Sequence, residues 1–280
     1  MSLLVRRTGP LATVQDRGRA GLAHLGVPRA GPLDAPAAAL ANRLVGNDAD
    51  AAVVEVTFGG LELRTDAGLW VAVTGAVVPV QVDRRPRGHA RAAWVPAGAT
   101  LRLGTPATGV RSYVAVAGGV AVAPVLGSRS TDTLAWVGPP RLEEGVVLPV
   151  GSSTGPPAPH DTPRPPRPGP LRLHPGPRAD WFAPGTLAAL CRAPYVVGEA
   201  SDRVGMRLEG PRLERVRDGE LPSEGMVLGA VQVPPSGLPV VLLADHPPTG
   251  GYPVPAVVEE DDLWRCAQLR PGDEVWFTPA

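Results

Sequence analysis

The sequence predicts a mainly β protein with two β-barrel-like lobes and few short helices. Short apolar runs dominated by valine and leucine recur in both halves, and Gly, Pro and Asp bound them at regular spacing. Such runs are typical of antiparallel barrels and sandwiches. Between the halves, residues 151–170 are dominated by proline and small polar residues, which cannot join a sheet ladder.

Length and composition agree with this division. The 280 residues include 44% apolar side chains, which is enough for two packed domains with separate cores. We therefore predict an N-terminal β-rich lobe with a short helix at residues 1–150, a semi-rigid linker at 151–170, and a C-terminal β-barrel lobe at 171–280. His160 lies in this linker, where we interpret it as a solvated residue.

The charge balance argues against nucleic acid and membranes as partners. The 27 basic and 27 acidic residues cancel, and they form no basic stripe with interleaved aromatic residues. No segment approaches the roughly 20 consecutive apolar residues that a membrane helix requires. We expect a soluble, cytoplasmic protein.

The sequence contains no lysine, which excludes several functions. A Walker loop places a lysine against the nucleotide phosphates, a Schiff-base enzyme needs an amine, and a biotin carrier is modified on a lysine. None of these can belong to this chain, so it cannot carry covalent biotin.

Cysteine and histidine spacing predicts neither disulfides nor metal sites. Cys191 and Cys266 lie far apart in expected helices without a C-x-x-C motif, so we expect buried free thiols. His24, His89 and His174 occur singly, without the spacing of a metal site. We expect no metal to be ligated by this chain.

The first half is expected to begin with a strand at residues 3–14. Asp34 is a good N-cap for a helix at 37–44, and Pro36 suits its first turn. Glu55 lies inside an apolar run, where it needs a hydrogen-bonded or ionic partner unless it faces solvent from an edge strand. The expected strands are residues 53–58, 61–63, 69–73, 77–82, 92–95, 101–103 and 112–117.

The second half has fewer regular segments. We expect an early helix from about residue 184 to 191. The acids at 259–262 stand at the start of another helix, which ends near Gln268, and we give them a capping role. Strands outside the hairpin described next are expected at 171–173, 195–197, 254–258 and 274–277.

The most informative stretch is a predicted β-hairpin that leads into a polar loop. Apolar runs at 226–233 and 238–244 flank a Pro-Pro-Ser-Gly turn, and the second run leads directly into DHPPTGGY at 245–252. The glycine pair in that loop would let backbone N–H groups converge on an anion or oxyanion, so we expect chemistry or binding there. The alternative is a simple turn whose backbone Asp245 caps.

Three further loops are polar. One follows the first strand at Gln15, Asp16 and Arg17, the second spans residues 127–133, and the third spans residues 198–211. Each loop combines carboxylates, arginines or hydroxyls, and could hold an anion or substrate. Each could equally satisfy its own polar groups by internal hydrogen bonds and ion pairs.

Taken in order, these segments resemble those of one known family. They are TVQDRGRAG, GVPRAGPLD, ANRLVGN, EVTFGG, GSRSTDTL, SDRVGMRLEGP, SEGMVLGAVQVPPSGLPVVLLADHPPTGGYP and AQLRPGDEVWF. The chain resembles the KipA-like family, which includes the C subunit of bacterial 5-oxoprolinase and is also labelled biotin-dependent carboxyltransferase or allophanate hydrolase subunit 2. It is also similar to half of the carboxyltransferase region of urea carboxylase. The resemblance covers nearly the whole chain apart from the proline-rich linker.

The resemblance implies a cyclophilin-like β-barrel architecture and a complex with a KipI-like B subunit. With a separate A subunit, this complex would open 5-oxoproline to glutamate, using ATP at the level of the complex. Four of the residues that match polar loop residues of the family cluster around the hairpin, and we expect them to be catalytic: Glu224, Asp245, Thr249 and Tyr252. It assigns substrate contacts to polar residues of both halves: Gln15, Asp16, Arg17, Asp34, Asn42, Asn47, Glu55, Ser201, Asp202, Arg203, Ser223, Gln232, Gly250 and Gly251.

Two segments depart from the pattern of that family. Where the family commonly shows Asp-Arg-Gln-Thr-Thr-Gly-Gly-Tyr, this chain has DHPPTGGY at 245–252, and it thereby lacks an arginine and an amide. Where the family commonly shows Ser-Gly-Ala-Met-Asp, this chain has AGPLD at 30–34. The first departure changes the side chains that are available to a substrate.

Lactam opening requires stabilisation of a tetrahedral oxyanion, an activated water and a proton for the leaving nitrogen. We hypothesise that the amides of Gly250 and Gly251, or an arginine such as Arg203, stabilise the negative charge, and that Glu224 or Asp245 transfers the proton. Two other functions stay open. One is carboxyl transfer to a urea-like or amide acceptor from a separate biotinylated carrier, and the other is a non-catalytic regulator of the KipA type.

Overall fold

The structure is a computed structural model that describes residues 1–153, 155–157, 169–217, 219 and 221–280. Its contacts divide it into two compact units. The first unit holds the described residues of 1–19, 30–132 and 136–165, and the second holds those of 20–29, 133–135 and 166–280. Most of the predicted linker, including His160, lies outside the described residues, so the lobe boundaries stay a prediction.

The first unit consists of two antiparallel sheets. In spatial order, the six-stranded sheet contains β11 (Val147–Pro149), β1 (Ser2–Thr8), β4 (Leu61–Thr65), β9 (Thr100–Leu103), β6 (Val80–Val82) and β7 (Arg85–Arg87). The five-stranded sheet contains β2 (Leu11–Gln15), β3 (Val53–Thr57), β10 (Arg111–Val116), β5 (Leu69–Gly75) and β8 (Ala92–Val95).

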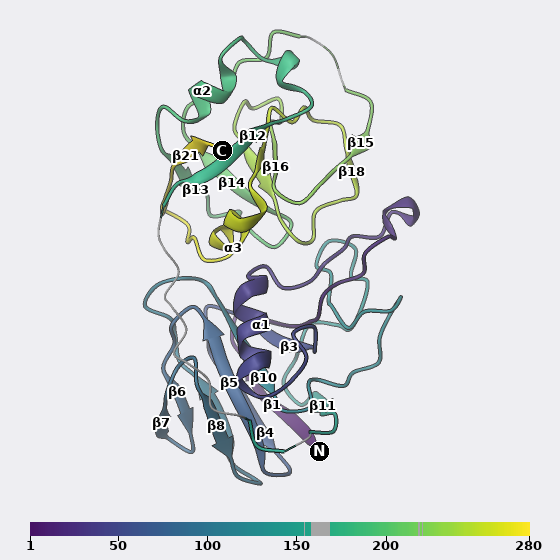
Figure 1. Ribbon diagram of the computed structural model, residues 1–280, viewed down its shortest axis with the longest axis vertical. Coiled ribbons are helices and arrows are strands. Elements are labelled where there is room, and N and C mark those ends of the chain that lie inside the picture. The colour runs from purple at the N-terminus through teal and green to yellow at the C-terminus, as the bar shows by residue number, and fades with distance from the viewer. Residues whose placement is uncertain (154, 158–168, 218, 220) are drawn as a thin grey trace. The chain divides into compact units, whose positions relative to one another are not determined.

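The two faces of the five-stranded sheet are both covered, which explains why every residue of β10 is buried. Because side chains alternate along a strand, Val114 and Val116 join the core shared with the six-stranded sheet, whereas Tyr113 and Ala115 face the other way. On that second face lies the helix α1 (Ala35–Leu44), which packs against β10 and β5 (Figure 1).

The helix prediction is confirmed, and the prediction for the opening strand is wrong in one respect. The Asp34 side chain accepts a hydrogen bond from the Ala37 N–H at 3.0 Å, as an N-cap should. The predicted strand at 3–14 is instead two strands, β1 and β2, in different sheets. Gly9 interrupts them at a φ of +69°, and a Cβ there would lie 1.9 Å from the Gly59 carbonyl oxygen.

The second unit is built around one eight-stranded sheet that is nearly closed. The strands are, in spatial order, β20 (Glu274–Val275), β13 (Tyr195–Val197), β14 (Gly205–Glu209), β17 (Val240–Leu242), β16 (Ala230–Gln232), β19 (Ala256–Val258), β12 (Leu171–Pro175) and β21 (Phe277–Pro279). The two edge strands, β20 and β21, are separated in sequence only by Trp276, so the chain itself joins the edges. The predicted closing strand at 274–277 is therefore two strands. A mainly β, barrel-like fold with few short helices is confirmed.

The predicted hairpin is present with shorter strands. β16 and β17 pair antiparallel, and the Gly237 N–H donates to the Pro234 carbonyl oxygen across the turn. The residues on either side of this hairpin form a separate two-stranded sheet of β15 (Glu224–Gly225) and β18 (Thr249–Gly250). The loop at 245–252 therefore contributes β18 to this sheet.

The helices of the second unit are short. They are α2 (Thr186–Leu190), α3 (Leu263–Cys266) and the 3-10 helices η1 (Ala23–Leu25), η2 (Ala179–Trp181) and η3 (Glu260–Asp262). Glu259 caps η3 as predicted, but the capping role given to Asp262 is wrong. Asp262 is buried and instead binds the guanidinium groups of Arg172 and Arg265.

Both cysteines are free thiols, as predicted. Cys266 is buried, and burial raises the pKa of its thiol to about 12. Cys191 follows the last residue of α2 and is only half-buried, so the predicted burial is wrong for this thiol. In the part of the chain that the structure describes, no helix combines the length and the apolar character needed to cross a membrane.

Candidate functional site

The first unit contains a row of polar side chains beneath α1. Strand register places Thr13 opposite Glu55, Glu55 opposite Tyr113, and Tyr113 opposite Thr74. All four side chains are buried. At one end of the row the Thr74 hydroxyl donates to the Ala37 carbonyl oxygen in α1 at 2.6 Å. The row thus fixes the helix on the sheet.

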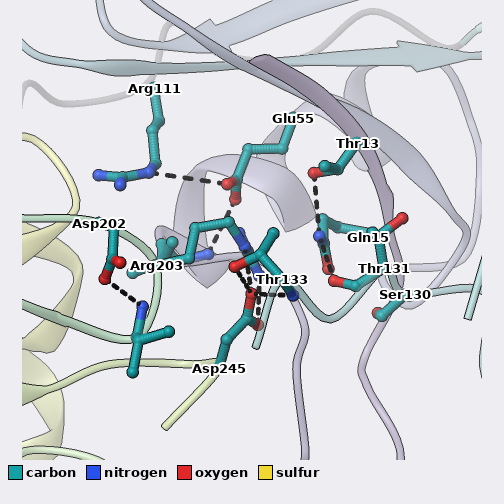
Figure 2. Close-up of polar contacts among 12 residues, drawn as sticks. Thr13, Gln15, Glu55, Arg111, Ser130, Thr131, Thr133, Asp202, Arg203 and Asp245 are labelled. Atoms are coloured by element: carbon teal, nitrogen blue, oxygen red, sulfur yellow. Dashed lines mark hydrogen bonds and ion pairs between the residues drawn. The ribbon is translucent and has the colours of Figure 1, made fainter. Parts of the chain in front are cut away.

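Glu55 binds groups from three parts of the first unit. Its Oε2 accepts hydrogen bonds from the Tyr113 hydroxyl at 2.9 Å and the Leu33 N–H at 3.0 Å. Its Oε1 lies 3.7 Å from the Arg111 Nε (Figure 2). Burial, followed by the charges of Glu55 and Asp34, raises the pKa of Tyr113 well above 10.0. The phenol therefore keeps its proton and donates a hydrogen bond to Glu55. Of the two alternatives left open by the sequence, the structure supports a buried, paired carboxylate.

Three other residues predicted to contact substrate hold the ends of α1. The Asp34 N–H donates to the Tyr113 hydroxyl at 2.7 Å, in addition to the capping role of its side chain. The Asn42 amide donates to the Ala49 and Ala51 carbonyl oxygens. The Asn47 amide bonds Asn42 and the carbonyl oxygen of residue 116, and its Oδ1 accepts from the N–H of residue 118. The structure therefore shows these three residues in contacts that support α1, and their contact with substrate stays a prediction.

Gln15 is buried at the end of β2. Its Nε2 donates to the Thr13 hydroxyl at 3.0 Å and the Thr131 carbonyl oxygen at 2.9 Å (Figure 2). Its Oε1 has no hydrogen-bond partner among the described residues.

The next residue, Asp16, organises the polar loop at 127–133. Its carboxylate accepts hydrogen bonds from the hydroxyls of Ser128 (2.5 Å) and Ser130 (2.8 Å) and from the N–H groups of Arg129 (2.6 Å) and Gly18 (3.0 Å). Burial acts to raise the pKa of this carboxyl, but these donors outweigh burial and hold the pKa below its ordinary value of 3.8. The charged carboxylate of Asp16 therefore links its own loop to the loop at 127–133 by hydrogen bonds.

Asparagine at Asp16 is expected to lower the free energy of unfolding by about 1–2 kcal/mol at neutral pH, because the loop donors lose a charged acceptor that is partly screened by solvent. Because the folded pKa lies below 3.8, the stabilisation is complete above about pH 5 and disappears as pH falls through the folded pKa. Urea unfolding of both proteins should show their difference shrinking between about pH 5 and pH 3.

Asp50→Asn is the matched control. Asp50 is exposed and lies 3.7 Å from Arg17, whose side chain is also exposed, so this substitution should change stability little at either pH. A stability difference for Asp16→Asn that stays constant down to about pH 3 would contradict the role given to its charge.

The second unit contains a buried ion pair between two predicted site residues. Asp245 and Arg203 have side chains 0% and 1% exposed, and the guanidinium donates from Nε to Oδ2 at 2.8 Å and from Nη2 to Oδ1 at 2.9 Å. The N–H and hydroxyl of Thr133 also donate to Oδ2, at 2.9 and 2.7 Å (Figure 2). Four donors thus occupy this carboxylate, so it serves to bind Arg203 and Thr133 rather than water.

The loop before Arg203 satisfies its own polar groups. Asp202, labelled in Figure 2, accepts through Oδ1 from the N–H groups of Val204 at 2.8 Å and Gly205 at 3.0 Å, which shapes a tight turn. The Ser201 hydroxyl accepts from the Arg207 N–H at 3.0 Å. These contacts fix the turn in which Arg203 lies.

The sheet of β15 and β18 brings together the remaining predicted residues of the second unit. Glu224 is paired with Gly250 across the sheet and binds Arg178, whose Nε donates to Oε2 at 2.9 Å. The side chain of Glu224 is 27% exposed. Four further predicted site residues belong to these two strands or directly flank them, and they are exposed or half-buried: Ser223, Thr249, Gly251 and Tyr252.

Gly250 and Gly251 lie where a side chain would be too close to neighbouring atoms. Neither Gly250 nor Gly251 has a positive φ. A Cβ on Gly250 would lie 2.8 Å from the Gln232 Nε2, and one on Gly251 would lie 3.0 Å from the Leu221 carbonyl oxygen. The absence of side chains lets the backbone lie close to the Gln232 amide and to the Leu221 carbonyl oxygen.

Sequence reasoning missed Arg178 and Tyr113. Arg178 precedes η2, and its partner Glu224 is 46 residues away. Tyr113 appeared only as an apolar residue of a predicted strand, although it contacts Glu55, 58 residues away. Among the described residues, no group of three His, Cys, Asp or Glu side chains is arranged to hold a metal ion.

The chain is similar to known proteins over nearly its whole length. Residues 25–279 match the family described as carboxyltransferase domain, subdomain A and B. The chain belongs to this family. It is 39% identical to the C subunit of 5-oxoprolinase from Escherichia coli over 98% of this chain and 90% of that protein. It is also 33% identical to urea amidolyase of Lachancea kluyveri, over 98% of this chain but only 17% of that protein. The family resemblance of the loop motifs is thereby confirmed.

Solved structures of family members share the fold. TTHA0988 is 43% identical with a TM-score of 0.89, and the match covers 99% of this chain and 55% of that chain. The urea carboxylase of Kluyveromyces lactis is 30% identical with a TM-score of 0.91, and the match covers 99% of this chain and 27% of that chain. This chain thus spans about half the length of the first protein and about a quarter of the second, so in both proteins the carboxyltransferase domain is joined to further sequence.

Proposed function

We propose that this chain is the C subunit of an ATP-dependent 5-oxoprolinase complex, which opens 5-oxoproline hydrolytically to glutamate. The observation that carries the proposal is the match to the Escherichia coli protein, which extends over 98% of this chain and 90% of that protein. The match covers nearly all of the Escherichia coli protein, whereas it covers only 17% of the urea amidolyase of Lachancea kluyveri.

The sheet of β15 and β18 supplies groups for lactam opening. Hydrolysis requires a group that accepts a proton from water and returns one to the leaving nitrogen. Glu224 suits this role because it is partly open to water, whereas Asp245 is fully buried and bound by four donors. In this proposal the exposed Thr249 and Tyr252 hydroxyls, together with the nearby glycine amides, orient the substrate and its developing negative charge.

The proposal places the phosphate chemistry in the complex rather than in this chain. Without lysine, the chain lacks the residue that a Walker loop sets against the β and γ phosphates. ATP therefore enters as a substrate of the whole complex, and the partners are a KipI-like B subunit and an A subunit. TTHA0988 supports a stable partner, because the match covers only 55% of that chain and the remainder is covalently attached to the matched region.

A second candidate is carboxyl transfer to a urea-like or amide substrate. The 33% identity to a urea amidolyase over 98% of this chain favours it. Because the chain has no lysine, the biotin would have to be carried by a separate protein. In that reaction the same surface of β15 and β18 would bind the acceptor amide.

The test is to co-purify this chain with the KipI-like and A-type proteins encoded nearest to it and to measure glutamate formation from 5-oxoproline. Glutamate formation that requires ATP and all three proteins is the expected result. A stable pair with the KipI-like protein that leaves 5-oxoproline intact but carboxylates an amide or urea with a biotinylated carrier would support the second candidate. A stable pair without any turnover would point to a regulatory role.

A further inference from the structure

Arg178 places a partly exposed guanidinium beside Glu224 of the sheet of β15 and β18. The side chain of Arg178 is 36% exposed and that of Glu224 is 27% exposed, so both side chains are accessible from solvent. By contrast, the Arg203 side chain is 1% exposed, and its guanidinium is bound to Asp245 at two points. Of these two arginines, only Arg178 is open to a ligand.

The backbone fixes Arg178 in this place. Its N–H donates to the Val254 carbonyl oxygen at 3.1 Å, and the Gly176 N–H donates to the Pro255 carbonyl oxygen at 2.8 Å. This close approach requires glycine at position 176, where a Cβ would lie 2.3 Å from the Val254 carbonyl oxygen. Val254 follows Tyr252 by two residues. The main chain of Arg178 is therefore attached to the segment directly after the Gly-Gly-Tyr sequence.

Glu224 occupies one edge of the Arg178 guanidinium and leaves another edge open. The Arg178 Nε donates to Glu224 Oε2 at 2.9 Å, and Nη2 pairs with Oε1 of the same carboxylate. Both contacts use the edge formed by Nε and Nη2, and Nη1 makes no hydrogen bond to the described residues. Because the guanidinium is a planar fork of five N–H groups, its Nη1 and Nη2 edge can bind a second carboxylate in the same bidentate manner.

A carboxylate bound at the open edge would lie close to Glu224, with the guanidinium between the two acids. The positive charge of Arg178 offsets the repulsion between them. In 5-oxoproline the carboxylate is attached to the ring carbon that is bonded to the lactam nitrogen. Binding this carboxylate at Arg178 therefore brings the leaving nitrogen close to Glu224, the group proposed to return a proton to it.

We propose that Arg178 is a specificity-determining residue that binds the carboxylate of a lactam acid through Nη1 and Nη2, while Glu224 holds the Nε edge. For the identity of the lactam, this inference rests on the proposed function. A urea-like or simple amide substrate has no such carboxylate and gains nothing from this contact. Arg178 therefore selects for substrates that carry a negative charge next to the ring nitrogen.

Equilibrium binding tests the carboxylate contact without turnover. Calorimetry without ATP, on the full-length chain alone and in its co-purified complex, compares 5-oxoproline with 5-oxoprolinamide, in which a neutral carboxamide replaces the carboxylate. The wild-type protein should bind the acid at least about tenfold more tightly than the amide, because hydrogen bonds to charged groups are stronger. In Arg178→Gln the dissociation constant of the acid should rise at least about tenfold, whereas that of the amide should change less than about threefold.

Two further variants serve as controls. Arg178→Lys keeps the charge but loses the planar fork, so it should retain part of the preference for the acid. Arg217→Gln removes an exposed arginine of the same unit, which lies 2.8 Å from Asp180, and should leave both dissociation constants unchanged. Circular dichroism checks that each variant is folded, as the partial exposure of Arg178 leads us to expect.

The outcomes separate this inference from the proposed function. If the complex converts 5-oxoproline but Arg178→Gln weakens the acid and the amide equally, or neither of them, the inference is wrong and the proposed function stands. If 5-oxoproline is not converted but Arg178→Gln abolishes a preference for the acid, the inference stands and the lactam acid enters another reaction. Binding of neither ligand, to the chain or to the complex, overturns the inference, and the conversion assay then decides the proposed function by itself.

Discussion

Replacing Asp245 with asparagine is expected to lower the free energy of unfolding of the second unit by about 3–5 kcal/mol, because it removes one partner of a buried ion pair. The substitution keeps the size of the side chain but replaces a charged oxygen with an N–H₂ group. That group would face donors of Arg203 or Thr133, both of which bind the carboxylate in the native structure. Urea unfolding of the full chain, followed by circular dichroism, measures the loss.

An exposed pair of the same unit provides the matched control. Asp180 lies 2.8 Å from the Arg217 Nη2, and the two side chains are about half exposed, at 48% and 55%. Asp180→Asn removes the same chemistry in water and should cost less than about 1 kcal/mol. A stable Asp245→Asn protein that loses only activity would contradict the structural role and restore Asp245 as the catalytic base.

The parts of the fold that could be predicted from sequence depend on local chemistry. The start of α1 follows from Asp34 and Pro36, whose effects act within one turn of the helix. The hairpin of β16 and β17 follows from the turn ending at Gly237, whose φ of +76° suits glycine. In both cases, the residues that decide the conformation are neighbours in sequence.

The errors occurred where the chain changes sheets. β1 continues into β2 after only two residues, and β20 into β21 after one, so each pair looked like one strand. Alternation of apolar residues reports that a face is buried, but it does not say which sheet a strand joins. The partner strands are set by distant residues, for example the pairing of Leu171 with Phe277.

The candidate site could be predicted only in its residue types. Sequence reasoning identified Glu55 as a carboxylate that needs a partner, but could not supply Tyr113 or Arg111. It also grouped Asp16 with substrate-binding residues, although the carboxylate binds hydroxyls 112 and 114 residues away. Polar loop residues that support structure and those that bind a ligand look alike until their partners are known.

Glu224 and Asp245 were both expected to transfer protons, but only the Glu224 side chain is partly exposed to water. We therefore predict a large effect on catalysis when Glu224 is replaced. Glu224→Gln in the reconstituted complex is expected to reduce kcat at least about 100-fold, with KM changed less than about threefold, because the substitution keeps the side-chain shape but removes its proton-transfer capacity. The measurement is ATP-dependent glutamate formation over a range of 5-oxoproline concentrations.

Stability and position must be excluded as causes of that loss. Glu199→Gln changes an exposed glutamate of the same unit and should leave both constants unchanged. Glu224→Gln itself should fold normally, because its partner Arg178 has a side chain that is 36% exposed and can be solvated. A Glu224→Gln complex with full kcat, or one in which only KM rises, would show that Glu224 binds or orients the substrate, and proton transfer would then belong to a group on another subunit.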